Sequence, residues 1–351
     1  MKRLFALSLA MLLCFTFPSC GQTEYSYPEE KLGGIQTSQG KIYPEPFITF
    51  DKTEVSFDMF RYYYLNYRDE YLKEDKDHFK AEGAEDAMKE EVLSCLLDYY
   101  AVLFLAKEYK VKLSDEEMDA VREDIQKTID FYGEEEEFLS VIHESHMSHG
   151  LYYKMMEYSS LYLKLFNTLY EDGGKEAWSD EEFYEYYRKN YLALQQIYIP
   201  FETGETETNH TETLAKANDV YNKAADGADF WKLIEAHGKD ETMLDYPDGF
   251  YITKGEAEDA LYEAANKLAI GEISKPVVGK SGLYIIKRLE LKELRMKENR
   301  STALFGYYDT TDTWHAGAYD SAFQELYRKR AEKIKVDYGT YWDQISSETV
   351  Y

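Results

Sequence analysis

Residues 271–278 read Gly-Glu-Ile-Ser-Lys-Pro-Val-Val, and residues 281–287 read Ser-Gly-Leu-Tyr-Ile-Ile-Lys. The first stretch is typical of a polar turn that leads into a short strand, because Gly, Ser and Pro favour turns and Val favours strands. Gly282 then permits a tight reversal, and the β-branched residues that follow predict a second strand. These stretches therefore predict two neighbouring strands that close a small unit.

The residues before this strand pair predict the rest of an α+β unit. A short apolar run predicts a strand at residues 193–200, and residues 250–252 are expected to form a short extended piece. Helical periodicity predicts helices at residues 214–237 and 256–268. Gly227 interrupts the first of these helices. The expected order is strand, helix, short helix, helix, strand and strand.

Several motifs in this unit resemble the parvulin-type peptidyl-prolyl isomerase domains. Residues 196–199 (Gln-Ile-Tyr-Ile) are similar to the first strand of that family, and residues 227–233 (Gly-Ala-Asp-Phe-Trp-Lys-Leu) to its helical motif. The two closing stretches resemble the family's Gly-Glu-Ile-Ser-x-Pro-Val and Gly-Tyr-His-Ile-Ile-Lys. The resemblance covers residues 191–291 and implies a parvulin-like domain there.

In that family two histidines and a Cys or Asp form a hydrogen-bonded network, and the resemblance places Gln196, Asp240 and Tyr284 at these positions. We predict these three as the candidate catalytic residues, because all three side chains can form hydrogen bonds. Gln and Tyr cannot titrate near neutral pH as a His pair can. An alternative is that Gln196 and Tyr284 only complete the core of an inherited fold.

The resemblance also implies a pocket for the substrate's proline ring. The family's Met and Phe fall at Ala257 and Leu261, and Phe250 and Tyr251 are further candidate substrate contacts. The smaller side chains remove apolar contact that contributes about 1–3 kcal/mol. An isomerase must favour the twisted amide over the planar one. We therefore expect the isomerase activity of this chain to be weak or lost.

Residues 47–178 predict a mostly helical domain. Aromatic residues at a spacing of three to four predict a helix over 57–71, and further helices are expected at 84–109, 114–131, 135–146 and 151–170. Ser114 and Ser179 each begin a capping box, because Glu follows three residues later.

The domain order resembles the PrsA/SurA-type foldases. That resemblance implies a SurA-N-like chaperone domain over 47–178, an inserted parvulin-like domain over 191–291 and a returning C-terminal helix. We expect residues 293–351, with a helix at 319–334, to pack back on the helical domain. The expected fold class is therefore α+β.

The N-terminus predicts export from the cytoplasm. Residues 1–19 carry two basic residues and then an apolar run too short to span a bilayer, which is typical of a signal peptide. Cys20, between Ser19 and Gly21, resembles the lipidated cysteine of a bacterial lipobox. We expect an extracytoplasmic protein anchored to the cell membrane by lipid at Cys20, with residues 20–46 as a flexible tether.

Charge and residue spacing exclude several other functions. The net charge is −27, with 67 acidic and 40 basic residues, which disfavours nucleic-acid binding. His143, His146 and His149 stand three apart, so on a helix they spread over about 120° and are poorly placed to share a metal ion. We therefore expect no metal and no cofactor.

These observations favour a folding factor that acts on unfolded or newly secreted polypeptides. The alternatives are a holdase-type chaperone lipoprotein without enzymatic activity and, third, a surface lipoprotein that binds a small ligand. The sequence leaves a homodimer open.

Overall fold

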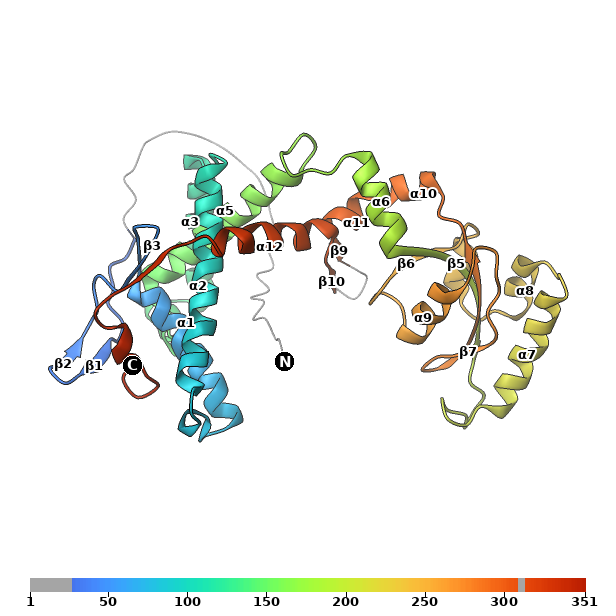
Figure 1. Cartoon of the computed structure of the whole chain (residues 1–351), viewed down its shortest axis with the longest axis horizontal. Coiled ribbons are helices and arrows are strands. Elements are labelled where there is room, and N and C mark those ends of the chain that lie inside the picture. The colour runs from blue at the N-terminus through green and yellow to red at the C-terminus, as the bar shows by residue number, and fades with distance from the viewer. Residues whose placement is uncertain (1–26, 309–312) are drawn as a thin grey trace. The chain divides into compact units, whose positions relative to one another are not determined.

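The computed structural model describes residues 27–308 and 313–351, which form two compact units. Unit 1 combines the described part of Met1–Lys175 with Phe323–Tyr351, and unit 2 is Glu176–Ala322 (Figure 1). The predicted signal peptide and Cys20 lie outside the described residues. Among the residues described, no helix has the length and apolar character needed to cross a membrane.

Unit 1 is built mainly from helices, and its core combines aromatic with aliphatic side chains. Phe57, Phe60 and Tyr64 are buried along one face of the first helix, as their spacing predicts. The helices are α1 (Phe57–Glu74), η1 (His78–Lys80), α2 (Ala84–Glu108), α3 (Asp115–Tyr132), α4 (Glu135–Glu144) and α5 (His149–Tyr170).

Both predicted capping boxes are confirmed. The Ser114 hydroxyl accepts the Glu117 amide at the start of α3, and the Glu117 carboxylate accepts the Ser114 amide. Ser179 and Glu182 do the same at the start of α6 (Asp180–Asn190). These reciprocal bonds satisfy backbone donors that the first helical turn would otherwise leave unpaired.

Small sheets join the two ends of the chain in unit 1. Strand β11 (Val336–Tyr338) pairs with β3 (Ile48–Phe50), which also pairs with β4 (Thr53–Val55). The expected tether over 20–46 is wrong in its second half, because β1 (Ile35–Thr37) and β2 (Gly40–Ile42) form a hairpin there. Ile35 is fully buried and forms a β-bridge with Val350. This segment is therefore held in place by a contact with a residue far away in the sequence.

The C-terminal segment is divided between the units, which differs from the expectation for 293–351. Residues up to Ala322 belong to unit 2, where Asn299 donates to the Tyr187 hydroxyl at 2.9 Å. The remainder belongs to unit 1, where Arg330 forms ion pairs with Asp51 and Glu108. The elements are α10 (Glu293–Glu298), α11 (Arg300–Phe305), β9 (Tyr307–Tyr308), β10 (Trp314–His315), α12 (Ala318–Ala331), β11 and η3 (Trp342–Gln344).

Unit 2 contains an antiparallel four-stranded sheet in the order β6-β5-β8-β7. The α+β class expected from the sequence is confirmed. The strands are β5 (Tyr191–Pro200), β6 (Phe250–Thr253), β7 (Val277–Val278) and β8 (Gly282–Leu289); the helices between them are α7 (Thr211–Ala225), α8 (Phe230–His237), η2 (Glu241–Asp245) and α9 (Asp259–Lys267).

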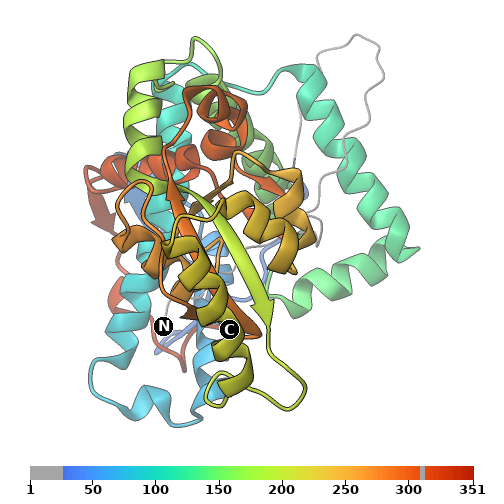
Figure 2. The ribbon, with the colours of Figure 1, turned by 90° about the vertical axis from the view of Figure 1, so that its right-hand side faces the viewer.

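Helices cover both faces of this sheet (Figure 2), and each face has a hydrophobic core of its own. Ile197 and Ile285 point to the face that packs against α7 and α8, whereas Leu194 and Ile286 point to the face that packs against α9. Because side chains alternate along a strand, every second residue of β5 and β8 shares the α9 face. This alternation determines which polar residues can meet on that face.

Candidate functional site

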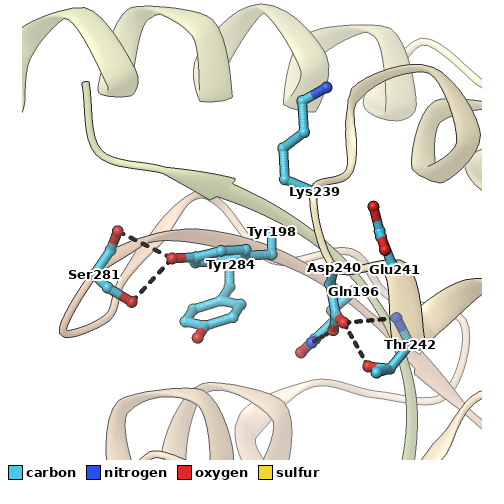
Figure 3. A pocket seen from close by; sticks show the side chains of 8 residues that line it. All are labelled: Gln196, Tyr198, Lys239, Asp240, Glu241, Thr242, Ser281 and Tyr284. Carbon is cyan, nitrogen blue, oxygen red and sulfur yellow. Dashed lines mark hydrogen bonds between the residues drawn. The ribbon is translucent and has the colours of Figure 1, made fainter. Parts of the chain in front are cut away.

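A hollow of about 490 Å³ lies beside the sheet of unit 2 (Figure 3). Strands β5 and β8, the start of η2 and the turn between β7 and β8 contribute its walls. The lining residues are Gln196, Tyr198, Lys239, Asp240, Glu241, Thr242, Ser281 and Tyr284. All three predicted catalytic residues are therefore at one site.

A side-chain hydrogen bond joins Gln196 to Asp240. The Gln196 amide nitrogen Nε2 donates to Oδ2 of Asp240 at 2.6 Å. The Asp240 Oδ1 accepts the backbone amide of Thr242 at 3.1 Å, so both carboxylate oxygens are oriented. Gln196 is only 8% exposed, and its own backbone amide donates to Met243 Sδ. The pair is therefore held in place on β5, an inner strand of the sheet.

The position of Asp240 depends on the loop that precedes η2. The Lys239 amide donates to the carbonyl of Tyr198 at 2.9 Å, which ties this loop to β5. Asp240 then caps η2, because its side chain accepts the Thr242 amide. The local sequence Lys-Asp-Glu-Thr therefore places a carboxylate over the strand.

Tyr284 has a different partner from the one expected. Its hydroxyl donates to Oε1 of Glu258 at 3.1 Å, and Oε2 of Glu258 accepts the Lys280 amide at 2.9 Å. Burial, together with the Glu258 charge, raises the pKa of Tyr284, so the phenol stays protonated at neutral pH. The expected network is therefore divided into a Gln196–Asp240 pair and a Tyr284–Glu258 pair.

Tyr198 is a lining residue that the sequence analysis missed. It lies opposite Tyr284 in the register of β5 and β8, and the two ring centroids are 5.0 Å apart. Its hydroxyl is 2.9 Å from Oγ of Ser281 and donates to the Ser281 carbonyl at 3.0 Å. Its place two residues after Gln196 was the available signal, because alternate strand residues share a face.

Three residues of the predicted proline pocket pack in, or at the edge of, the core under the α9 face of the sheet. Leu261 is 5% exposed and packs in the core beneath the sheet with Leu194 and Ile286. Ala257 and Phe250 pack at the edge of the same core. None of these three residues is among those lining the hollow.

Tyr251 does not belong to this face of the sheet. It pairs with Ala193, whereas its neighbour Phe250 pairs with Leu194, so alternation places Tyr251 on the opposite face. Its hydroxyl accepts the backbone amide of Lys292 at 2.8 Å. Tyr251 is therefore removed from the candidate substrate contacts.

The three histidines in the His143–His149 stretch each have their own acidic partner. His143 pairs with Glu30 at 2.9 Å, His146 with Asp69 at 2.7 Å and His149 with Glu135 at 3.7 Å. No group of three metal-binding side chains occurs within residues 27–308 and 313–351.

Comparison with known proteins assigns the domain that holds the hollow. Residues 187–292 match the family model described as the PPIC-type PPIASE domain. The chaperone SurA of Saccharophagus degradans is 28% identical over 126 residues, which cover 34% of this chain and 29% of that protein. The match thus spans less than a third of the length of that relative.

Solved structures of PrsA and of a parvulin are also similar to this chain. PrsA from Bacillus anthracis is 19% identical, covering 68% of this chain and 88% of its own, with a TM-score of 0.28. The parvulin NmPin of Nitrosopumilus maritimus is 25% identical, covering 29% of this chain and 97% of its own, with a TM-score of 0.24. Residues 187–292 therefore match the PPIC-type, or parvulin, family of peptidyl-prolyl isomerase domains, and part of the chain is similar to a SurA chaperone.

Proposed function

We propose that this protein is an extracytoplasmic folding factor whose parvulin domain binds Xaa-Pro segments of unfolded or newly secreted polypeptides and isomerises them slowly. The observation that carries this proposal is the hydrogen bond between Gln196 and Asp240 in the hollow of the PPIC-type domain. It supplies an oriented carboxylate where the family has its catalytic network.

The chemistry requires no covalent step. A planar Xaa-Pro amide carries partial negative charge on its oxygen, and rotation about the C–N bond removes this polarisation. A carboxylate beside that oxygen disfavours the planar amide more than the twisted one, which lowers the barrier. Asp240 would have this role, and Gln196 would hold its carboxylate in place.

Two features of the site support slow rather than fast turnover. The hollow is lined by many polar side chains, so water competes for the substrate amide. Leu261 is buried in the core and offers little surface to a proline ring at the family's usual position. The degenerate site thus remains part of the proposal.

The N-terminal features complete the proposed function. Residues 1–19 would direct export, lipid on Cys20 would anchor the protein to the membrane, and residues 47–178 would form a chaperone domain. The sequence pattern supports export and the lipid anchor, and the SurA relative, a chaperone, supports the chaperone domain. A homodimer stays a prediction.

An aromatic groove in unit 1 favours the alternative of a holdase without catalysis. The groove has a volume of about 290 Å³ and is lined in part by Tyr99, Tyr100, Leu103, Tyr158 and Leu161. Such a surface suits apolar segments of unfolded chains whether or not the parvulin domain turns over.

Cis–trans exchange of an Ala-Pro peptide, measured by NMR with the full chain, tests the proposed function. We expect exchange above the uncatalysed rate and a loss of about tenfold in Asp240→Asn, since one carboxylate charge is removed while the shape is kept. Asp245→Asn is the matched control, because Asp245 ends the same short helix and does not line the hollow. Suppressed client aggregation without any exchange would favour the holdase.

A further inference from the structure

The apolar surface of the hollow comes from two tyrosine rings. Tyr198 and Tyr284 face each other across β5 and β8, with an angle of 33° between their rings. Both side chains are half-buried, whereas Leu261 is buried in the core below them. A ligand in the hollow therefore meets these rings and not the position at which the family holds proline.

Hydrogen bonds fix both rings by their hydroxyl ends. Tyr198 is held by Ser281 at 2.9 Å (Figure 3). Tyr284 donates to Glu258 at 3.1 Å. In Figure 3 the two rings lie on one side of the hollow and the Gln196–Asp240 pair on the other. Since the hydroxyls already have partners, what the rings offer a ligand is their aromatic surface.

Two glycines in the adjoining turn make room for the rings. A Cβ atom on Gly279 would lie 2.4 Å from Cε2 of Tyr284, and one on Gly282 would lie 2.5 Å from Cε2 of Tyr198. Both distances are far shorter than a van der Waals contact. The turn between β7 and β8 thus accommodates the tyrosine pair through residues without side chains.

We propose that the Tyr198–Tyr284 pair is the subsite for the proline ring of the Xaa-Pro substrate. This inference rests on the proposed isomerase function and replaces the pocket expected at Ala257 and Leu261. The C–H bonds next to the proline nitrogen are electron-poor, and they favour the electron-rich face of an aromatic ring.

The spacing of the site agrees with this subsite. Gln196 and Tyr198 are two residues apart on one face of β5, so their Cα atoms are separated by about 7 Å. A proline ring on the tyrosine pair would leave the preceding carbonyl near the Gln196–Asp240 pair. Ring binding and carbonyl polarisation would then occur at adjacent positions of one hollow.

Peptide binding to variants of the full chain tests this subsite. The probe is an Ala-Ala-Pro-Phe peptide, and the reference peptide has Ala in place of Pro. We expect Tyr198→Ala to weaken binding of the proline peptide about tenfold, a loss of about 1.4 kcal/mol, because the ring contact is lost. Tyr198→Phe keeps the ring and should bind within about twofold of wild type.

Tyr246→Ala is the matched control, because Tyr246 is an exposed tyrosine at the end of η2 and does not line the hollow. It should leave binding unchanged. Intermolecular NOEs between the peptide's proline protons and tyrosine ring protons provide a second measurement that needs no folded variant. We expect these NOEs in wild type.

The outcomes separate the subsite from the function it rests on. If wild type isomerises the proline peptide while Tyr198→Ala binds it equally well, or if no proline–tyrosine NOE is seen, the subsite is wrong and the proposed function stands. If wild type neither binds nor isomerises the proline peptide, both are wrong. Equal affinity for the two peptides also contradicts a proline subsite.

Discussion

The hydroxyl of Tyr284 lies 3.1 Å from the carboxylate of Glu258, which was not among the residues predicted for the hydrogen-bonded network. The other Glu258 oxygen holds the Lys280 amide, so one side chain orients both the phenol and the β7–β8 turn. The carboxylate is the acceptor, and Tyr284 therefore serves as a fixed neutral donor. The candidate site thus has hydrogen-bonding side chains that do not titrate near neutral pH at the two positions where the resemblance implies histidines.

The first prediction concerns the pH dependence of catalysis. The rate at which wild type catalyses cis–trans exchange of Xaa-Pro peptides should show no inflection between pH 6 and 8. The reason is that Gln196 cannot titrate and that burial raises the pKa of Tyr284. The double variant Q196H/Y284H should gain an inflection near pH 6.5 and a several-fold higher rate. NMR exchange measured across this range checks both statements, and an inflection in wild type would argue against them.

The second prediction concerns the close approach of the β7–β8 turn to the site. Gly279→Ala places a Cβ 2.4 Å from Tyr284 and 2.8 Å from Oε2 of Glu258, so the ring or the turn must move. We expect a loss of about 1–3 kcal/mol in the free energy of unfolding and weaker Xaa-Pro binding.

Gly255→Ala is the control for this prediction. Gly255 has φ +94°, and no atom lies within 4 Å of its added Cβ, so the cost is backbone strain of about 1–2 kcal/mol. Denaturant unfolding should show a loss in both variants, whereas peptide titration should show a loss only in Gly279→Ala. Equal binding by both variants would be inconsistent with the crowded turn.

The third prediction concerns stability at alkaline pH. Tyr187 is fully buried, and this burial raises its pKa to about 12 although Asn299 donates to its hydroxyl. A pKa raised in the folded state contributes stability that is complete below about pH 10, the unfolded pKa, and is lost as pH rises toward 12. A shift of this size contributes about 3 kcal/mol.

Urea unfolding at several values between pH 8 and 11 measures this contribution. Tyr187→Phe should have a shallower fall in unfolding free energy above pH 10 than wild type, because one titrating group has been removed. At pH 8 the variant should lose about 1 kcal/mol from the missing hydrogen bond. Parallel curves for the two proteins would show that Tyr187 does not contribute.

The fourth prediction uses the two capping boxes as a matched pair. Ser179→Ala removes the cap of α6 in unit 2, and Ser114→Ala removes the cap of α3 in unit 1. Each change should cost about 1 kcal/mol, because one helix loses a partner for its first-turn amides. Hydrogen exchange should rise locally, at residues 180–184 in the first variant and at 115–119 in the second. If either substitution alone raised hydrogen exchange at the starts of both helices, the two caps would not act independently and this prediction would be contradicted.

The sequence predicted those parts of the fold that depend on local signals. The alternation and turn residues around Gly282 predicted β8, and serine followed by glutamate predicted the starts of α3 and α6. The hairpin at residues 35–42 was missed, because Ile35 is ordered by Val350 at the other end of the chain. No local pattern contains that contact.

The sequence predicted three residues of the site but not all of their hydrogen-bond partners. Gln196 and Asp240 were predicted and are bonded to each other, whereas the Glu258 partner of Tyr284 depends on where α9 begins relative to the β7–β8 turn. The position of Tyr198 opposite Tyr284 depends on the register of β5 against β8. Tyr251 was predicted on the wrong face of the sheet, because the pairing of β6 with β5 determines that face. Register between strands is a long-range property that a single sequence does not specify.

The most direct test of a retained isomerase site is the cis–trans exchange rate of an Ala-Pro peptide with wild type and Asp240→Asn at pH 7. Uncatalysed exchange takes tens to hundreds of seconds at 25 °C. An active site around Gln196 and Asp240 predicts faster exchange with wild type and about tenfold less acceleration with the variant. An exchange rate with wild type equal to that of the peptide alone would contradict it.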